Sequence, residues 1–208
     1  MKNIPNQLTM SRILLVFIFV VLAHFDDGSN QNSFQVSPQT AWVCHLIAYC
    51  LAIIGGLTDL FDGYLARKYH WESDFGRLID PLADKLFVMA TFAMLVEYNY
   101  MPAWVLIAIL AREFMVTGLR TLASAKGIVI AADKWGKLKT ASQMAALVIC
   151  GFSWVFCGKI SWVPDLKEPG TTAHIVWMII LYIVAGLTIL SGTSYFVKHK
   201  KLYMGSMF

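Results

Sequence analysis

Residues 59–84 read DLFDGYLARKYHWESDFGRLIDPLAD, and this stretch joins two apolar segments of the chain. Four of its five aspartates, Asp59, Asp62, Asp80 and Asp84, lie at the inner ends of these two segments. On a helix, positions i and i+3 or i+4 share a face, so Asp59 and Asp62 point one way from the first segment. Asp80 and Asp84 point one way from the second. If the two faces meet, four carboxylates converge, and that much negative charge in or near a bilayer requires cations.

The donor atoms of this motif indicate the kind of cation. Carboxylate oxygens suit Mg²⁺ or Mn²⁺ rather than zinc, and a two-metal site of this kind is suited to displacement at phosphorus. Gly63 and Ala66 are small enough for a ligand to approach the backbone, and Arg67 adds a planar fork that suits phosphate. These features predict a cradle for a nucleotide diphosphate beside the metal. The alternative is a cluster of salt bridges with Arg67 and Arg77 at the ends of the helices.

Two residues of the stretch predict how the second segment begins. Gly76 would allow a tight turn into it, and Pro81 would fit the first turn of a helix that starts at Asp80.

The composition indicates an integral membrane protein. Of the 208 residues, 58% are hydrophobic and only 14% are charged, whereas an ordinary soluble domain has about 25% charged residues. The first apolar run lacks a cleavage-site pattern and is expected to be retained. We therefore expect one all-α transmembrane domain over residues 1–208. Apolar length predicts six transmembrane helices, near Thr9 to Phe25, Thr40 to Ala66, Asp80 to Tyr98, Pro102 to Ala125, Trp135 to Cys157 and Thr172 to Val197.

The positive charges gather on one side of this predicted arrangement. Basic residues lie at both ends of the chain, between the second and third spans and between the fourth and fifth. The opposite loops, 26–40 and 158–171, have no such excess. The positive-inside rule then places both termini and the aspartates on the cytoplasmic side. The net charge of +4 is explained by topology, so we expect no nucleic-acid partner.

The aspartate motif resembles a known family. The spacing of Asp59, Asp62, Asp80 and Asp84, with Gly63, Ala66, Arg67 and Gly76 between them, matches the CDP-alcohol phosphotransferase signature at every fixed position. The resemblance implies transfer of a phosphoalcohol group from a CDP-alcohol to a hydroxyl, with release of CMP. It also implies six transmembrane helices, a homodimer and divalent metal bound by the motif aspartates.

Other segments resemble one branch of that family, the bacterial phosphatidylglycerophosphate synthases. The segments are 3–12 (NIPNQLTMSR), 112–120 (REFMVTGLR) and 127–140 (GIVIAADKWGKLKT). The implied substrates are CDP-diacylglycerol and sn-glycerol 3-phosphate, in a bacterial inner membrane and among its lipids. Other family members remain alternatives, with phosphatidylglycerol, inositol phosphate or serine as the acceptor.

Four cations are candidates for binding the acceptor phosphate, namely Arg112, Arg120, Lys137 and Lys139. An arginine at the depth of Arg112 in a span requires a cavity or a partner. The alternatives are an ion pair of Arg112 with Glu113 and an ordinary topology-setting role for the two lysines.

The roles of the remaining candidates follow from the resemblance and from position. Asp84 is the expected general base for the acceptor hydroxyl. CDP-diacylglycerol is expected to contact Asp62, Gly63, Ala66, Arg67 and Gly76. Asn6, Thr9 and Arg12 are expected at its nucleotide end, or else as a helix cap with interfacial charge. Two alternatives to an enzyme remain, an ion channel or transporter and a non-catalytic lipid-binding scaffold. The acidic residues cluster at one membrane face, which is not typical of an ion path across the bilayer.

Overall fold

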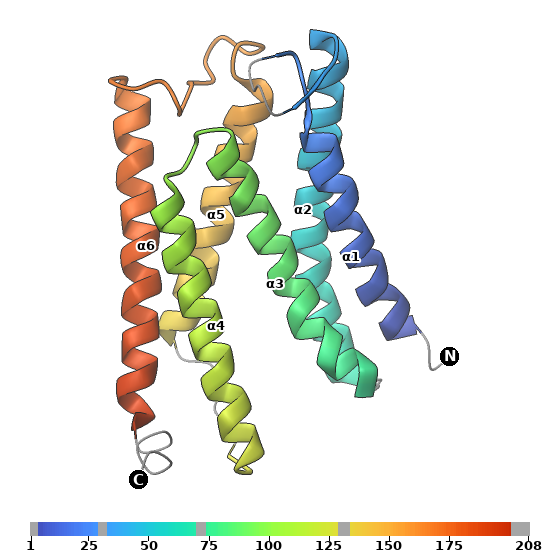
Figure 1. Cartoon of the computed structure of the whole chain (residues 1–208), viewed down its shortest axis with the longest axis vertical. Helices are drawn as coiled ribbons and strands as arrows, with labels where there is room; N and C mark the ends of the chain where they lie inside the picture. The colour runs from blue at the N-terminus through green and yellow to red at the C-terminus, as the bar shows by residue number, and fades with distance from the viewer. Residues whose placement is uncertain (1–3, 29–32, 70–73, 129–133, 201–208) are drawn as a thin grey trace. The chain divides into compact units, whose positions relative to one another are not determined.

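The structure is a computed structural model that describes the backbone of residues 4–28, 33–69, 74–128 and 134–200. It describes side chains over residues 10–28, 33–56, 85–128 and 135–200. Helices dominate the described chain (Figure 1). In order, the elements are α1 (Ile4–Ala23), β1 (Phe25–Asp26), β2 (Phe34–Gln35), α2 (Pro38–Tyr69), α3 (Asp74–Glu97), α4 (Ala103–Ala125), α5 (Lys134–Phe156) and α6 (Thr172–Lys198).

The length and composition of these helices suit a membrane protein. Among the described residues, three stretches are long and apolar enough to cross a bilayer, namely Pro38–Gly56, Trp135–Phe156 and Thr172–Lys198. Met10–Ala23 of α1 is a shorter apolar stretch. Charged side chains at Arg112, Glu113 and Arg120 interrupt the apolar sequence of α4. The all-α class is confirmed, whereas six crossings with cytoplasmic termini stay a prediction.

The predicted start of the third helix is wrong. α3 begins at Asp74 rather than Asp80, because polar residues extend the helix beyond the apolar run from which it was predicted. Gly76 therefore lies within the helix and not in a turn. Pro81 lies in the helix interior and not in the first turn. Because proline has no N–H, the hydrogen bond from position 81 to the carbonyl of Arg77 is missing. The other five helices overlap their predicted ranges.

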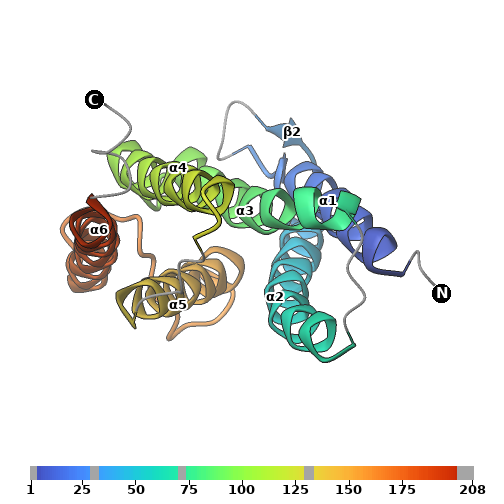
Figure 2. The same ribbon diagram turned by 90° about the horizontal axis from the view of Figure 1, so that it is seen from below.

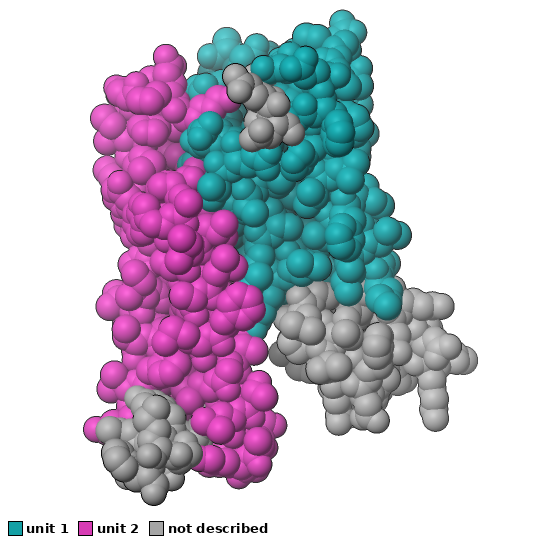
Figure 3. Space-filling view, in the orientation of Figure 1, with its two compact units in different colours: residues 1–100, 148–165 teal, residues 101–147, 166–208 magenta. Residues whose placement is uncertain are grey.

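The chain divides into two compact units (Figure 3). Unit 1 comprises residues 1–100 and 148–165, and unit 2 comprises residues 101–147 and 166–208. α5 therefore contributes its first part to unit 2 and its last part to unit 1. That residues 1–208 form one domain stays a prediction.

In unit 1, α1 packs against both α2 and α3 (Figure 2). Its buried residues Val16, Phe19 and Ala23 recur every three or four positions, which places them on one face. The Phe19 and Phe87 rings lie with centroids 6.5 Å apart. Gly55 of α2 leaves the space that the Phe87 ring fills, since a Cβ there would lie 2.9 Å from that ring.

The end of unit 1 where α1 finishes and α2 begins is closed by short strands and side chains. β1 and β2 pair in parallel within the predicted 26–40 loop. Two-residue strands carry no periodicity, so the sequence did not predict them. The Tyr98 hydroxyl donates to the carbonyl of Ala23, which ties the end of α1 to the chain after α3. Tyr100 is also buried here, and burial raises the pKa of its phenol.

The last part of α5 lies against α2. The Trp42 indole donates to the carbonyl of Val155 at 3.1 Å, and the Tyr49 hydroxyl donates to the carbonyl of Val148 at 3.0 Å. The Tyr49 ring then lies over the bare backbone of Gly151. A Cβ at Gly151 would come within 2.5 Å of that ring. Close approach of these two helices therefore requires glycine at this position.

The substitution Gly151→Ala tests this packing. The added methyl group must displace the Tyr49 ring, and such overpacking costs about 1–3 kcal/mol of unfolding free energy. We expect a lower Tm in detergent for Gly151→Ala. The control is Gly186→Ala in α6, where an added Cβ meets nothing within 4 Å and Tm should not fall. Equal Tm values for the two variants would contradict the packing described here.

Candidate functional site

The aspartate motif lies at the α2–α3 end of unit 1. Asp59 and Asp62 lie in the last turns of α2, and Asp80 and Asp84 lie in the first turns of α3. The chain from Tyr69 to Asp74 spans at most about 18 Å, so both pairs flank one short connection. Their grouping stays a prediction. The predicted site residues whose side chains lie outside the described part of the chain are Asn6, Thr9, Asp59, Asp62, Gly63, Ala66, Arg67, Gly76, Asp80 and Asp84.

The predicted cationic residues lie in unit 2, where α4 packs against α6. The buried face of α4 consists of Val105, Ile109, Val116, Leu119 and Ala123. Residue 112 falls between Ile109 and Val116 in this three-to-four spacing. An arginine therefore occupies a position of the packed face where an apolar residue would be expected.

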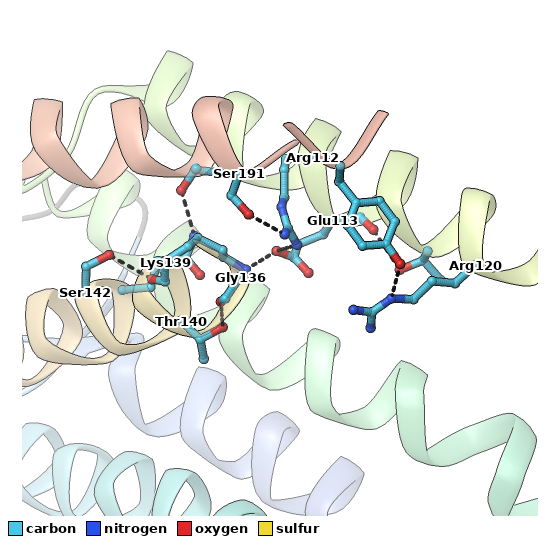
Figure 4. Close-up of polar contacts among 12 residues, drawn as sticks. Arg112, Glu113, Arg120, Gly136, Lys139, Thr140, Ser142 and Ser191 are labelled. Carbon is cyan, nitrogen blue, oxygen red and sulfur yellow. Dashed lines mark hydrogen bonds and ion pairs between the residues drawn. The ribbon is translucent and has the colours of Figure 1, made fainter. Parts of the chain in front are cut away.

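Glu113 forms ion pairs with cations from two helices (Figure 4). Its Oε1 lies 3.4 Å from Nη1 of Arg112 and also accepts from Nζ of Lys139 on α5. Only 11%, 18% and 6% of the Arg112, Glu113 and Lys139 side chains are exposed. The Arg112–Glu113 pair considered as an alternative from the sequence is therefore present, with Lys139 as a second partner.

The Arg112 guanidinium is held from two sides. Besides its contact with Glu113, its Nη2 donates to the Ser191 hydroxyl of α6 at 2.7 Å. Its Nε is buried and has no hydrogen-bond partner within the described part of the chain. A buried donor without a partner costs about 1–3 kcal/mol. A ligand that accepts a hydrogen bond from Nε would remove this cost and bind more tightly for that reason.

The other two predicted cations lie apart from this cluster. Arg120 lies two turns along α4, where its Nε donates to the Tyr195 hydroxyl at 2.9 Å and its guanidinium lies 5.5 Å from the Tyr195 ring centroid. Lys137 is exposed on α5. The structure thus brings Arg112 and Lys139 together through Glu113. Arg12, in unit 1, is buried on α1.

Sequence reasoning missed the contribution of α6. Its residues Thr188, Ser191 and Tyr195 are buried, and each hydroxyl accepts from a side chain of α4 or α5. Single hydroxyls in a long apolar run rarely stand out, because Ser and Thr also bond to their own helix. Their shared three-to-four spacing is the one signal that could have found them.

The cluster is suited to binding an anion. Among these three side chains, Arg112 and Lys139 carry two positive charges and Glu113 carries one negative charge. Charge-assisted hydrogen bonds from arginine to phosphate or carboxylate are stronger than neutral ones. The arrangement therefore favours a small anionic ligand over a neutral one.

Comparison with known proteins agrees with the resemblance drawn from the motif. A family model described as CDP-alcohol phosphatidyltransferase matches residues 2–190. The chain is 44% identical over 149 residues to the CDP-diacylglycerol–glycerol-3-phosphate 3-phosphatidyltransferase of Bacillus subtilis, which covers 71% of this chain and 75% of the relative. It is 35% identical over 196 residues to the protein of the same name from Rickettsia typhi, covering 94% and 96%.

The substitution Glu113→Gln tests the ion-pair cluster. It removes the carboxylate that contacts both buried cations, and breaking a buried pair in this way costs about 3–5 kcal/mol. We expect Tm in detergent to fall by about 5–10 °C. Removal of one cation as well, in Glu113→Gln with Lys139→Met, should recover part of that loss. Glu168→Gln, at an exposed position, is the control. An unchanged Tm for Glu113→Gln would show that the ion pairs contribute little.

Proposed function

Since this chain belongs to the CDP-alcohol phosphatidyltransferase family, we propose that it transfers the phosphatidyl group of CDP-diacylglycerol to sn-glycerol 3-phosphate. The products are phosphatidylglycerol phosphate and CMP. The observation that carries this proposal is the likeness, over nearly the whole chain, to relatives whose names state this reaction. The buried cationic cluster of unit 2 supports a phosphorylated acceptor over a neutral one such as serine.

A divalent metal site is the proposed role of Asp59, Asp62, Asp80 and Asp84. Four carboxylates form a donor set that fits Mg²⁺ or Mn²⁺, with Asp84 completing a second of two sites. When bound, the metal supplies positive charge that offsets the pyrophosphate of CDP-diacylglycerol and stabilises the departing CMP. Around the nucleotide, Gly63, Ala66, Arg67 and Gly76 are the proposed contacts, together with Asn6 and Thr9.

Asp84 is the proposed general base. It takes the proton from the C1 hydroxyl of glycerol 3-phosphate while that oxygen attacks the phosphorus that bears diacylglycerol. The bond from this phosphorus to the CMP oxygen breaks, and CMP leaves with the electron pair. The phosphate of glycerol 3-phosphate binds to Arg112 and Lys139. Arg120 and Lys137, which lie apart from this pair, are the further cations proposed from the sequence. The buried position of Arg112 supports this assignment, as does its Nε, which has no hydrogen-bond partner among the residues whose side chains are described.

The membrane arrangement completes the proposal. The protein crosses a bacterial inner membrane six times, as a homodimer among membrane lipids, with both termini and the active site on the cytoplasmic side. The excess of Lys and Arg in the connections on one side supports this orientation. Large apolar side chains exposed on the helices, such as Phe17, Ile107 and Ile183, support contact with lipid.

An acceptor panel tests the function. Purified protein in detergent receives CDP-diacylglycerol, Mg²⁺ or Mn²⁺ and one acceptor at a time, with CMP release and lipid product measured. We expect product with glycerol 3-phosphate and its loss when a chelator removes the metal. Product only with inositol phosphate, phosphatidylglycerol or serine would overturn the acceptor assignment and leave the family chemistry in place.

The substitutions Asp80→Asn and Asp84→Asn test the motif. Each removes a charge on which the proposed metal site or base depends, so we expect turnover to fall by about 100-fold or more. Asp74→Asn, in the same helix but outside the motif, is the matched control and should retain activity. Tm measured in detergent separates lost chemistry from lost folding. Activity like that of the wild type in either motif variant would refute the assignment.

A further inference from the structure

Three buried hydroxyls form one stripe on α6. Thr188, Ser191 and Tyr195 are 0%, 3% and 2% exposed, and their spacing of three and four residues places them on a single face. Each accepts a hydrogen bond from another helix: from Gln143 at 3.2 Å, from Arg112 at 2.7 Å and from Arg120 at 2.9 Å. Two of the three donors are arginines of the proposed acceptor site.

α6 contacts Arg112 in two ways, through the hydrogen bond to Ser191 and through packing of the side chain on the backbone. A Cβ at Gly192 would lie 3.0 Å from Cγ of Arg112, so the stem of the arginine runs directly over this glycine. At the other end of the side chain, a Cβ at Gly136 of α5 would lie 3.6 Å from Nη2. The arginine therefore extends between two glycines of neighbouring helices. Ser191 accepts a hydrogen bond from the end of its side chain (Figure 4).

This arrangement fixes the direction of the guanidinium. Glu113 accepts a hydrogen bond from Nη1 and Ser191 accepts one from Nη2. Acceptors on two helices therefore set the plane of the guanidinium. The buried Nε then has one defined direction, without a partner among the described residues. A rigid planar fork loses less entropy on binding phosphate than a mobile one does.

We infer that Ser191 and Gly192 are positioning residues that orient Arg112 and thereby set the affinity for the acceptor phosphate. The inference rests on the proposed function. Ser191 acts through Arg112 and does not itself contact the acceptor. Without its hydroxyl, Nη2 loses its acceptor and the guanidinium is free to turn. With a methyl group at position 192, the stem of Arg112 must shift by a few tenths of an ångström, and the fork shifts with it.

Steady-state kinetics with each substrate varied in turn tests the inference. We expect Ser191→Ala to raise the KM for glycerol 3-phosphate about tenfold, because the variant loses one hydrogen bond to a charged group. Gly192→Ala should raise it in the same direction. The KM for CDP-diacylglycerol should change little, and loss of one buried hydrogen bond should lower the Tm by only a few degrees. Ser191→Thr keeps a hydroxyl and should return the KM to within about threefold of the wild-type value.

The matched controls come from the same helix. Thr193→Val removes a hydroxyl that bonds only to carbonyls of α6, and Gly186→Ala adds a methyl group in open space. Both should leave the KM for glycerol 3-phosphate near the wild-type value. An equal rise in both KM values for Ser191→Ala would overturn the inference in favour of a purely structural role. A KM for glycerol 3-phosphate like that of the wild type would overturn it as well.

A binding measurement separates this inference from the proposed function. The Tm of each protein is followed as inorganic phosphate is added, because a ligand that binds the folded state raises Tm. A rise in the wild type and in Thr193→Val that is lost in Ser191→Ala supports the positioning role, even if glycerol 3-phosphate gives no lipid product. The same rise in Ser191→Ala, or none in the wild type, overturns the inference.

Discussion

Charge that lies within apolar helices must be paired, and this constraint decides which side chains of the helices in unit 2 contact one another. Glu113 is the centre of that pairing, because one carboxylate serves a cation of its own helix and a cation of α5. A buried pair of this kind is weak evidence of net stability, since desolvation offsets much of the attraction. The position of this pair in a packed helix face is in keeping with the anion-binding role that we propose for the cations.

The polar contacts also explain how α5 is held. α4 and α6 pack closely along an apolar face, whereas the first part of α5 reaches them through long side chains, Lys139 to Glu113 and Gln143 to Thr188. In lipid there is little hydrophobic drive between helices, so interhelical hydrogen bonds and small residues become more important. Gly136, Gly192 and the hydroxyls of α6 fit that account.

The sequence predicted the helices well because apolar length is a strong signal, and it predicted some of the site because charge in such segments is rare. Arg112 and Glu113 could be identified in that way. The start of α3 could not, because residues 74–79 are polar and carry no apolar period. The contact of Lys139 with Glu113 depends on how α5 is set against α4, which no local pattern encodes. Ser191 was missed because a serine hydroxyl in an apolar run usually bonds to its own helix, and Tyr195 because its largely apolar ring fits an apolar run.

The passage of Arg112 between two glycines couples three positions in separate helices. A side chain added at position 136 or 192 changes the space for residue 112, and a shorter residue at 112 would leave both glycines facing a void. Substitutions at positions in contact are not additive. Scanning one residue at a time would therefore rate each of these positions as intolerant and would miss tolerated combinations. A library that varies all three together would test whether the anion proposed to bind beside Arg112 can be exchanged for another.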